Sequence, residues 1–180
     1  VLAVSGGETT LNSATPSSIL GPGSFTSIGT YNGHTYYRSN STANWADAKT
    51  ICENAGGYLA VITTAAENNF IHTNLGINAH VWIGVSDEAN EATHVWVTGE
   101  TFSYTNWQSG QPNNVTTQDH GGMYYTTGTW WDDYGHISYK YILEIPSASP
   151  TPSYIYTLGI DYAGLPNGYE VLTVSPAENA

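Results

Sequence analysis

The spacing of apolar residues predicts two helices in the first half of the chain. Between residues 43 and 55 apolar positions recur every three or four residues, which is the period of a helix with one buried face. Ser41 or Thr42 precedes this segment as a candidate N-cap, and Gly56-Gly57 ends it. A second helix is predicted to begin at Thr64-Ala65-Ala66-Glu67, because its first and last residues match a capping box.

Strand signals surround and follow these helices. Asn32-Gly33 lies between tyrosines and is typical of a hairpin turn, since both residues tolerate the positive φ that such a turn needs. Further strands are predicted at residues 81–85, 95–97 and 137–145. Helices first and strands afterwards predict an α+β fold.

The two ends of the chain differ from the middle. Residues 1–28 are rich in Gly, Ser, Thr and Pro, and they are predicted to form loop with one or two short strands. A Pro and Ser cluster at residues 146–153 is typical of a linker. After it, residues 154–162 and 169–174 alternate as the two strands of a hairpin. Because two strands alone are marginal in water, this hairpin is expected to pair with the N-terminal segment, the middle domain or a neighbouring unit.

Charge restricts the partners. The 180-residue chain has 3 basic and 15 acidic residues, which gives a net charge of −12. Nucleic acid and anionic membranes are therefore poor partners, because binding them requires Lys and Arg. No stretch is apolar for the roughly 18 residues of a membrane span, so no membrane insertion is predicted. The acidic excess fits either hard cations held by oxygen ligands or a surface that merely keeps the protein soluble.

Signatures of catalysis are missing from the sequence. It contains no Gly-x-Ser-x-Gly elbow, no phosphate-binding glycine loop and no His-Glu-x-x-His motif. Cys52 is the only cysteine, so it can form neither an internal disulfide nor a zinc cluster with other thiols. The chain is thus predicted not to be an enzyme.

Several separated motifs, in order, resemble the C-type lectin-like family. They are Trp45-Ala46-Asp47-Ala48, Gly56-Gly57-Tyr58-Leu59-Ala60-Val61-Ile62, Trp82-Ile83-Gly84, Val95-Trp96-Val97-Thr98-Gly99, Gly110-Gln111-Pro112-Asn113-Asn114, Gly128-Thr129-Trp130-Trp131-Asp132-Asp133 and Tyr141-Ile142-Leu143-Glu144. Each motif is weak alone, but their order and spacing over residues 29–146 are specific. The resemblance implies a C-type lectin-like domain at 29–146, between an N-terminal extension (1–28) and a linker with a C-terminal hairpin (147–180).

The resemblance also implies calcium sites, because many family members hold Ca²⁺ through oxygen-bearing side chains and let sugar hydroxyls complete its shell. The ligands of one site, which would also bind carbohydrate, map to Gln111, Asn113, Gln118, Asp132 and Asp133, with a cis Gln111-Pro112 bond. A second site maps to Asp87, Glu91, Asn114 and Asp119.

The pattern departs from the family near Trp130-Trp131. Aligning Trp131 with the family's Trp-Asn-Asp motif makes Asp132 and Asp133 the ligands, and this alignment is preferred here. Aligning Trp130 instead puts Trp131 where Asn belongs and leaves only Asp132. Under the first alignment, Trp130 either stacks on a sugar or belongs to the core. Gln118 stands where the family usually has Glu, which lowers the negative charge of the site.

The family's disulfides are absent, since Leu143 stands at the position of the partner of Cys52, and His120 and a residue near Gly135 replace the other pair. Disulfide-free versions resemble domains of bacterial surface adhesins, and the flanking segments resemble immunoglobulin-like adhesin repeats. The resemblance therefore implies an extracellular, secreted or cell-surface adhesin module that binds glycans or glycoproteins through calcium, with neighbouring copies as further partners. The alternative is a structural or protein-binding repeat of a filamentous protein with a degenerate site.

Overall fold

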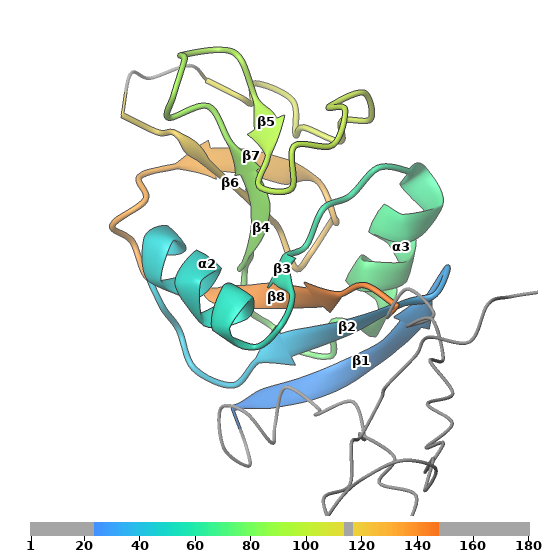
Figure 1. Cartoon of the computed structure of the whole chain (residues 1–180). Coiled ribbons are helices and arrows are strands. Elements are labelled where there is room, and N and C mark those ends of the chain that lie inside the picture. Colours follow the sequence, from blue (N-terminus) through green and yellow to red (C-terminus); the bar gives the residue numbers. More distant parts are fainter. Residues whose placement is uncertain (1–23, 114–116, 148–180) are drawn as a thin grey trace, which may run out of the picture. The chain divides into compact units, whose positions relative to one another are not determined.

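The computed structural model describes residues 24–113 and 117–147 (Figure 1). Two helices and a mixed sheet build this part of the chain. In chain order the elements are β1 (Phe25–Tyr31), β2 (His34–Ser39), α2 (Trp45–Asn54), β3 (Tyr58–Leu59), α3 (Ala65–Asn74), β4 (Val81–Ser86), β5 (Val95–Trp96), β6 (His120–Met123), β7 (Trp130–Asp133) and β8 (Lys140–Ile145). The predicted α+β class is confirmed.

The sheet places the last strand of the domain at its centre. Its order is β1-β2-β8-β4-β6-β7, with β3 added on β8 and β5 on β4. Only β4 and β8 run parallel, and the other pairs are antiparallel. The predicted Asn32-Gly33 turn joins β1 to β2, with both residues at positive φ. The sheet therefore brings the start and the end of the domain together.

The helix starts agree with the sequence in one case and correct it in the other. The side chain of Thr64 caps α3 by accepting a hydrogen bond from the Glu67 amide, as predicted. Helix α2 is capped by Asn44, whose Oδ1 accepts from the Asp47 amide at 2.8 Å, and not by Ser41 or Thr42. The reason is that Ala43 still pairs in extended form with Tyr139. A helix cannot begin before that pairing ends.

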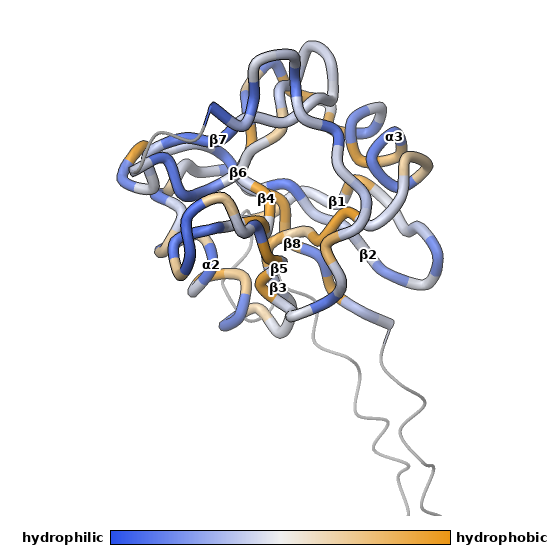
Figure 2. The backbone as a smooth tube through the Cα atoms, turned by 90° about the horizontal axis from the view of Figure 1, so that it is seen from above, coloured by the Kyte–Doolittle hydropathy of each residue, from blue (hydrophilic) through white to orange (hydrophobic). Residues whose placement is uncertain are grey.

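The core divides into two clusters, one on each face of β4. All six residues of β4 are buried. Val81, Ile83 and Val85 face one cluster with α3, whereas Trp82 faces the other with α2. This alternation is the two-residue period of a strand. In Figure 2 the most hydrophobic stretches of backbone lie on β3, β4 and β8, which run through this region.

Strands β6 and β7 were not predicted, because Gly121-Gly122 is a poor strand signal. The structure shows why glycine stands there. A Cβ on Gly121 would lie 2.2 Å from the Val85 side chain, and one on Gly122 would lie 2.3 Å from the ring of Trp131. Glycine is therefore required at these two positions by close packing against neighbouring side chains, and not by strand propensity.

The positions that would carry the family's disulfides are packed without them. Cys52 and Leu143 are both fully buried in the cluster below α2, and burial raises the pKa of the Cys52 thiol. This confirms Cys52 as a buried apolar residue. A Cβ on Gly135 would lie 2.7 Å from Nδ1 of His120, so these two positions also face each other.

Some predictions fall outside the described residues. The C-terminal hairpin and residues 1–23 belong there, whereas β1 begins at Phe25, inside the segment assigned to the N-terminal extension. In the part that the structure describes, neither helix has the length and apolar character needed to cross a membrane.

Candidate functional site

The loop at Gln111 and Asn113 meets strand β7 at Asp132. The Gln111-Pro112 peptide bond is cis, as the resemblance implied. The amide of Asn113 donates to both oxygens of the Asp132 carboxylate, at 3.1 and 3.2 Å. The Asp132 amide in turn donates a long 3.5 Å hydrogen bond to Oε1 of Gln111. Three of the predicted ligands thus lie together, around a carboxylate that is only 3% exposed.

Asp133 does not join this group. Its Oδ2 accepts from the Tyr139 hydroxyl at 2.9 Å and from the Trp131 indole at 3.3 Å, and its Oδ1 accepts from the Tyr134 amide. Burial and the Asp133 hydrogen bond raise the pKa of Tyr139 to about 12, so the hydroxyl stays protonated and donates. Neighbouring residues on a strand point to opposite faces, which separates Asp133 from Asp132. In this structure the Asp133 carboxylate is therefore held apart from the group around Asp132.

Trp130 is a core residue. It is fully buried, and its indole N–H donates to Oδ1 of Asn68 at 2.7 Å. Its ring packs edge-on against Trp96, Tyr104 and Trp107, with centroids 5.6 to 5.7 Å apart. A ring enclosed in this way cannot stack on a sugar, so its assignment to carbohydrate binding is wrong. The packing also favours the alignment through Trp130, which puts Trp131 in the place of the family's Asn.

Two predicted ligands carry buried oxygens that lack a hydrogen-bond donor within the described residues. These atoms are Oε1 of Gln118 and Oδ1 of Asp87. The other oxygen of Asp87 accepts from the Ala92 amide at 2.8 Å, and Nε2 of His94 lies 3.6 Å away. A buried acceptor without a partner is unfavourable by about 1–3 kcal/mol, and a hard cation would remove that penalty. Both atoms therefore fit calcium ligands.

A group of carboxylates lies around Asp87. The backbone amide of Asp87 donates to the backbone oxygen of Asp119 at 3.1 Å, which joins two residues of the second predicted site. Loss of hydration and repulsion from Asp87 and Asp119 raise the pKa of Glu91, which is exposed. Asn114 lies outside the described residues. The charges of Asp87 and Asp119 therefore act on the Glu91 carboxylate, which brings three residues of the second predicted site into one neighbourhood.

Carboxylates and imidazoles alone do not complete either site. Among residues 24–113 and 117–147, no three His, Cys, Asp or Glu side chains are grouped so that they could hold a metal ion. Amide and backbone oxygens must therefore contribute, as they do in many calcium sites. Because Gln111, Asn113 and Gln118 are neutral, Asp132 would be the single charged ligand if these four residues held a cation.

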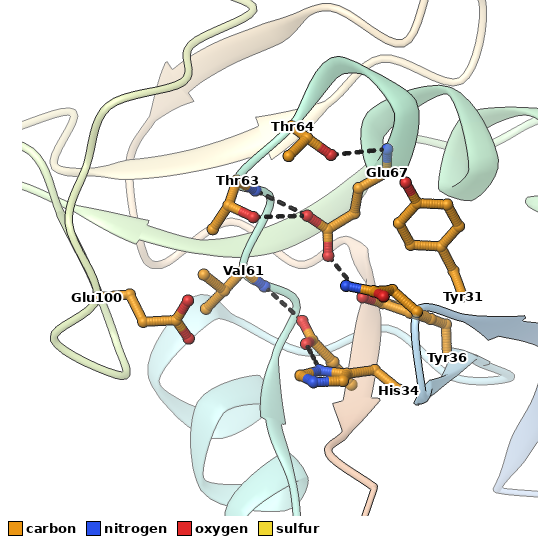
Figure 3. Close-up of a pocket in the computed structure, with 10 residues that line it drawn as sticks. Tyr31, His34, Tyr36, Val61, Thr63, Thr64, Glu67 and Glu100 are labelled. Atoms are coloured by element: carbon orange, nitrogen blue, oxygen red, sulfur yellow. Dashed lines mark hydrogen bonds and ion pairs between the residues drawn. The ribbon is translucent and has the colours of Figure 1, made fainter.

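A separate cavity of about 210 Å³ lies between β2, β8 and the start of α3, and the sequence did not predict it (Figure 3). Glu67 and Glu144 line it, 7% and 2% exposed. Glu144 accepts from the Val61 amide at 2.9 Å and the Tyr58 hydroxyl at 3.1 Å, and it pairs with His34. The sequence contained one indication of this buried carboxylate, because Glu144 is the only acidic residue in the apolar strand β8.

The Glu67 carboxylate also accepts several hydrogen bonds in the same cavity. It accepts from the Tyr36 hydroxyl and from the amide and hydroxyl of Thr63. Every carboxylate oxygen of the pair thus has a donor, which makes a structural role sufficient to explain both residues. Together they connect β2 and β8 to the segment that leads into α3.

Glu144 should make stability depend on pH. Burial raises its pKa above the ordinary value of 4.5, so the folded protein binds this proton more tightly than the unfolded chain. Its contribution to the free energy of unfolding is thus greatest below pH 4.5 and falls as pH rises through the folded pKa. Relative to wild type, Glu144→Gln should become more stable as pH rises from 4 to 7, measured by chemical denaturation. The control is Glu100→Gln, at an exposed residue of the same cavity, and a parallel pH profile for both variants would contradict the prediction.

Comparisons with known proteins agree with the fold. The profile of the Lectin C-type domain family matches residues 41–143. Lectin BRA-3 from Megabalanus rosa is 37% identical over 120 residues, covering 64% of this chain and 74% of that protein. The C-type lectin domain family 4 member M of Symphalangus syndactylus is 36% identical over 107 residues, which is 57% of this chain but only 25% of the relative.

Solved structures give the same result. The carbohydrate-recognition domain of the mouse scavenger receptor C-type lectin superposes with a TM-score of 0.63 and 28% identity, covering 72% of this chain and 99% of that domain. C-type lectin CEL-I from Cucumaria echinata superposes with a TM-score of 0.63 and 26% identity, covering 70% and 97%. These relatives are animal lectins, which bind carbohydrate and are not enzymes. The chain belongs to the C-type lectin domain family, whose members are not enzymes, and its described part has the fold of a C-type lectin carbohydrate-recognition domain.

Proposed function

We propose that this domain binds carbohydrate through a calcium ion held by Gln111, Asn113, Gln118 and Asp132. The observation that carries the proposal is the meeting of the Gln111 and Asn113 loop with the buried Asp132 carboxylate. The unpartnered oxygen of Gln118 supports it. A second calcium ion, held by Asp87, Glu91, Asn114 and Asp119, would stabilise the neighbouring loop.

Each group would have a distinct role in recognition. When bound, calcium offers coordination positions to two hydroxyls of a sugar. The amide groups of Gln111 and Asn113 can both donate and accept hydrogen bonds, so they can orient those hydroxyls. Asp132 would supply the negative charge that retains the cation, because the other three residues are neutral. One carboxylate implies a weak calcium site whose occupancy depends strongly on calcium concentration.

We place this activity outside the cell, on a secreted or cell-surface protein whose partners are glycans or glycoproteins. Family membership supports this location, since C-type lectins are typically secreted or displayed on the surface. The flanking segments 1–28 and 147–180 would connect the domain at 29–146 to neighbouring copies, as in a surface adhesin. This part of the proposal rests on the sequence of the flanks.

A second function is favoured by the residues around β7. Trp131 occupies the family's Asn position, and the Asp133 carboxylate is bound to Tyr139 and Trp131. The first feature removes an oxygen ligand that the family's sugar-binding calcium site has, and the second keeps the Asp133 carboxylate from replacing it. The domain would then be a structural or protein-binding module with a degenerate calcium site.

Calcium titration separates the two functions. Calorimetry on the wild-type chain should show calcium binding, and a glycan array should give signals that a chelator abolishes. Asn113→Ala should weaken both, whereas Glu53→Ala, an exposed residue of α2, should change neither. No heat of calcium binding, together with no chelator-sensitive glycan signal, would support the structural module.

The neutral residue at position 118 offers a gain-of-function test. Gln118→Glu should raise calcium affinity roughly tenfold, because it adds a second carboxylate at a position whose oxygen lacks a donor. The same substitution should lower stability without calcium, since it places a charge where the Gln118 oxygen is buried without a donor. Calorimetry and thermal unfolding with and without calcium measure both effects. Unchanged affinity would exclude Gln118 from the ligand set.

A further inference from the structure

The connection between β2 and α2 contains an acceptor sequence for N-linked glycosylation. Asn40-Ser41-Thr42 fits the pattern Asn-x-Ser/Thr, which is modified on surface loops of secreted proteins. A second match, Asn114-Val115-Thr116, falls outside the described residues. We propose that Asn40 carries an N-linked glycan when this chain passes through a eukaryotic secretory pathway. The inference rests on the proposed extracellular location.

The acceptor residues are accessible in the folded domain. Asn40, Ser41 and Thr42 are all exposed and lie outside any helix or strand. The backbone is nevertheless fixed on both sides, because the Asn40 amide donates to the Ser24 oxygen at 3.0 Å and the Lys140 ammonium donates to the Asn40 oxygen at 2.8 Å. The loop can therefore carry a bulky group without losing its conformation.

The chemistry of the bond preserves the hydrogen bond between the side chains of Asn40 and Thr26. Oδ1 of Asn40 accepts from the Thr26 hydroxyl at 2.8 Å. In the modification, the amide nitrogen of Asn40 bonds to the anomeric carbon of a lipid-linked oligosaccharide, loses one proton and displaces the lipid pyrophosphate. The product is a secondary amide that keeps its carbonyl oxygen as an acceptor. The contact with Thr26 is thus compatible with the glycan.

The loop is remote from the candidate calcium residues. In Figure 1 the β2–α2 connection runs at the lower side of the domain, whereas the loops around β5, β6 and β7 lie at the top. A glycan on Asn40 would therefore cover the surface near β1 and the start of β8 and leave the candidate binding loops open. Its removal should not change calcium or glycan binding, which makes the modification testable apart from the proposed function.

Site occupancy can be measured by peptide mapping. The full chain, carrying Thr116→Ala so that Asn40 is the sole acceptor and Asn114 is kept, is expressed behind a secretion signal in animal cells. The translocated chain is digested with peptide N-glycosidase in heavy-oxygen water, which converts a glycosylated asparagine to a labelled aspartate. Asn40 should be labelled, and the intact mass should fall by one glycan. Thr42→Ala should abolish the label, whereas Ser41→Ala, at the variable middle position, should retain it.

Each outcome decides the inference. Labelled Asn40 that depends on Thr42 supports it, and an unlabelled Asn40 in the translocated chain overturns it. Calcium titration of the same Thr116→Ala chain before and after deglycosylation tests the calcium proposal separately. If Asn40 is glycosylated and neither sample binds calcium, only the proposed function is overturned. If the chain binds calcium and Asn40 carries no glycan, only the glycosylation proposal is overturned.

Discussion

Asp132→Asn should lower calcium affinity by roughly a hundredfold, about 2.7 kcal/mol, and abolish chelator-sensitive glycan binding. Asp132 is the only charged member of its ligand set, so the substitution removes the main attraction for a divalent cation. Asparagine keeps one oxygen that can accept from the Asn113 amide, so the loop should keep its conformation. Calorimetry with Ca²⁺ and a glycan array measure the two effects.

Asp133→Asn is the matched control on the same strand. Its carboxylate accepts from Tyr139, Trp131 and Tyr134, so the substitution should reduce stability by about 1–2 kcal/mol without changing calcium affinity. The reverse result, with calcium lost in Asp133→Asn and retained in Asp132→Asn, would restore the alignment through Trp131. A calcium affinity that is unchanged in both variants would show that neither aspartate is a calcium ligand.

The sequence predicted the fold because several independent signals agreed. Apolar spacing predicted α2 and α3, and Asn32-Gly33 predicted the β1–β2 hairpin. The resemblance implied the cis bond at Gln111. Strands β6 and β7 could not be predicted in this way, because their residues are chosen by close packing between neighbours. Gly122, for example, leaves room for the ring of Trp131.

The candidate site was only partly predictable, for a different reason. Oxygen-rich residues between 111 and 133 indicated a cation site, but the direction of each side chain depends on the strand register. Because two tryptophans and then two aspartates are adjacent, a shift of the alignment by one residue exchanges the side chains that point inward with those that point outward. The motif allowed both alignments, and only the pairing of β7 with β6, which sets Asp132 opposite Gly121, separated Asp132 from Asp133.

The Glu67 and Glu144 pair shows a limit of motif reasoning. Glu67 was recognised as part of a capping box, but its carboxylate accepts from Thr63 and Tyr36 instead of turning back to Thr64. Glu144 is 77 positions away along the chain, since 144 − 67 = 77. No local pattern could bring the two together, because the sheet joins β2 to β8 through long-range pairing.

Trp130→Ala should reduce the free energy of unfolding by about 3–5 kcal/mol, because it empties a fully enclosed volume among three aromatic rings. It also leaves the buried Asn68 side chain without its 2.7 Å donor. That loss is a large share of the 5–15 kcal/mol that stabilises a typical domain. Trp130→Phe keeps part of the volume and should fold with a smaller loss, about 1–3 kcal/mol. Chemical denaturation measures both.

The phenylalanine variant also decides between a core role and a sugar-stacking role for Trp130. A core residue changes stability and leaves calcium-dependent glycan affinity within about twofold of wild type, once the variant is folded. A sugar-stacking residue would do the opposite, with affinity reduced and the denaturation midpoint retained. Tyr125→Phe is the control, because it conserves a half-buried ring packed beside the same core and should change neither quantity. Since Trp130 has no exposed surface, we expect the first pattern.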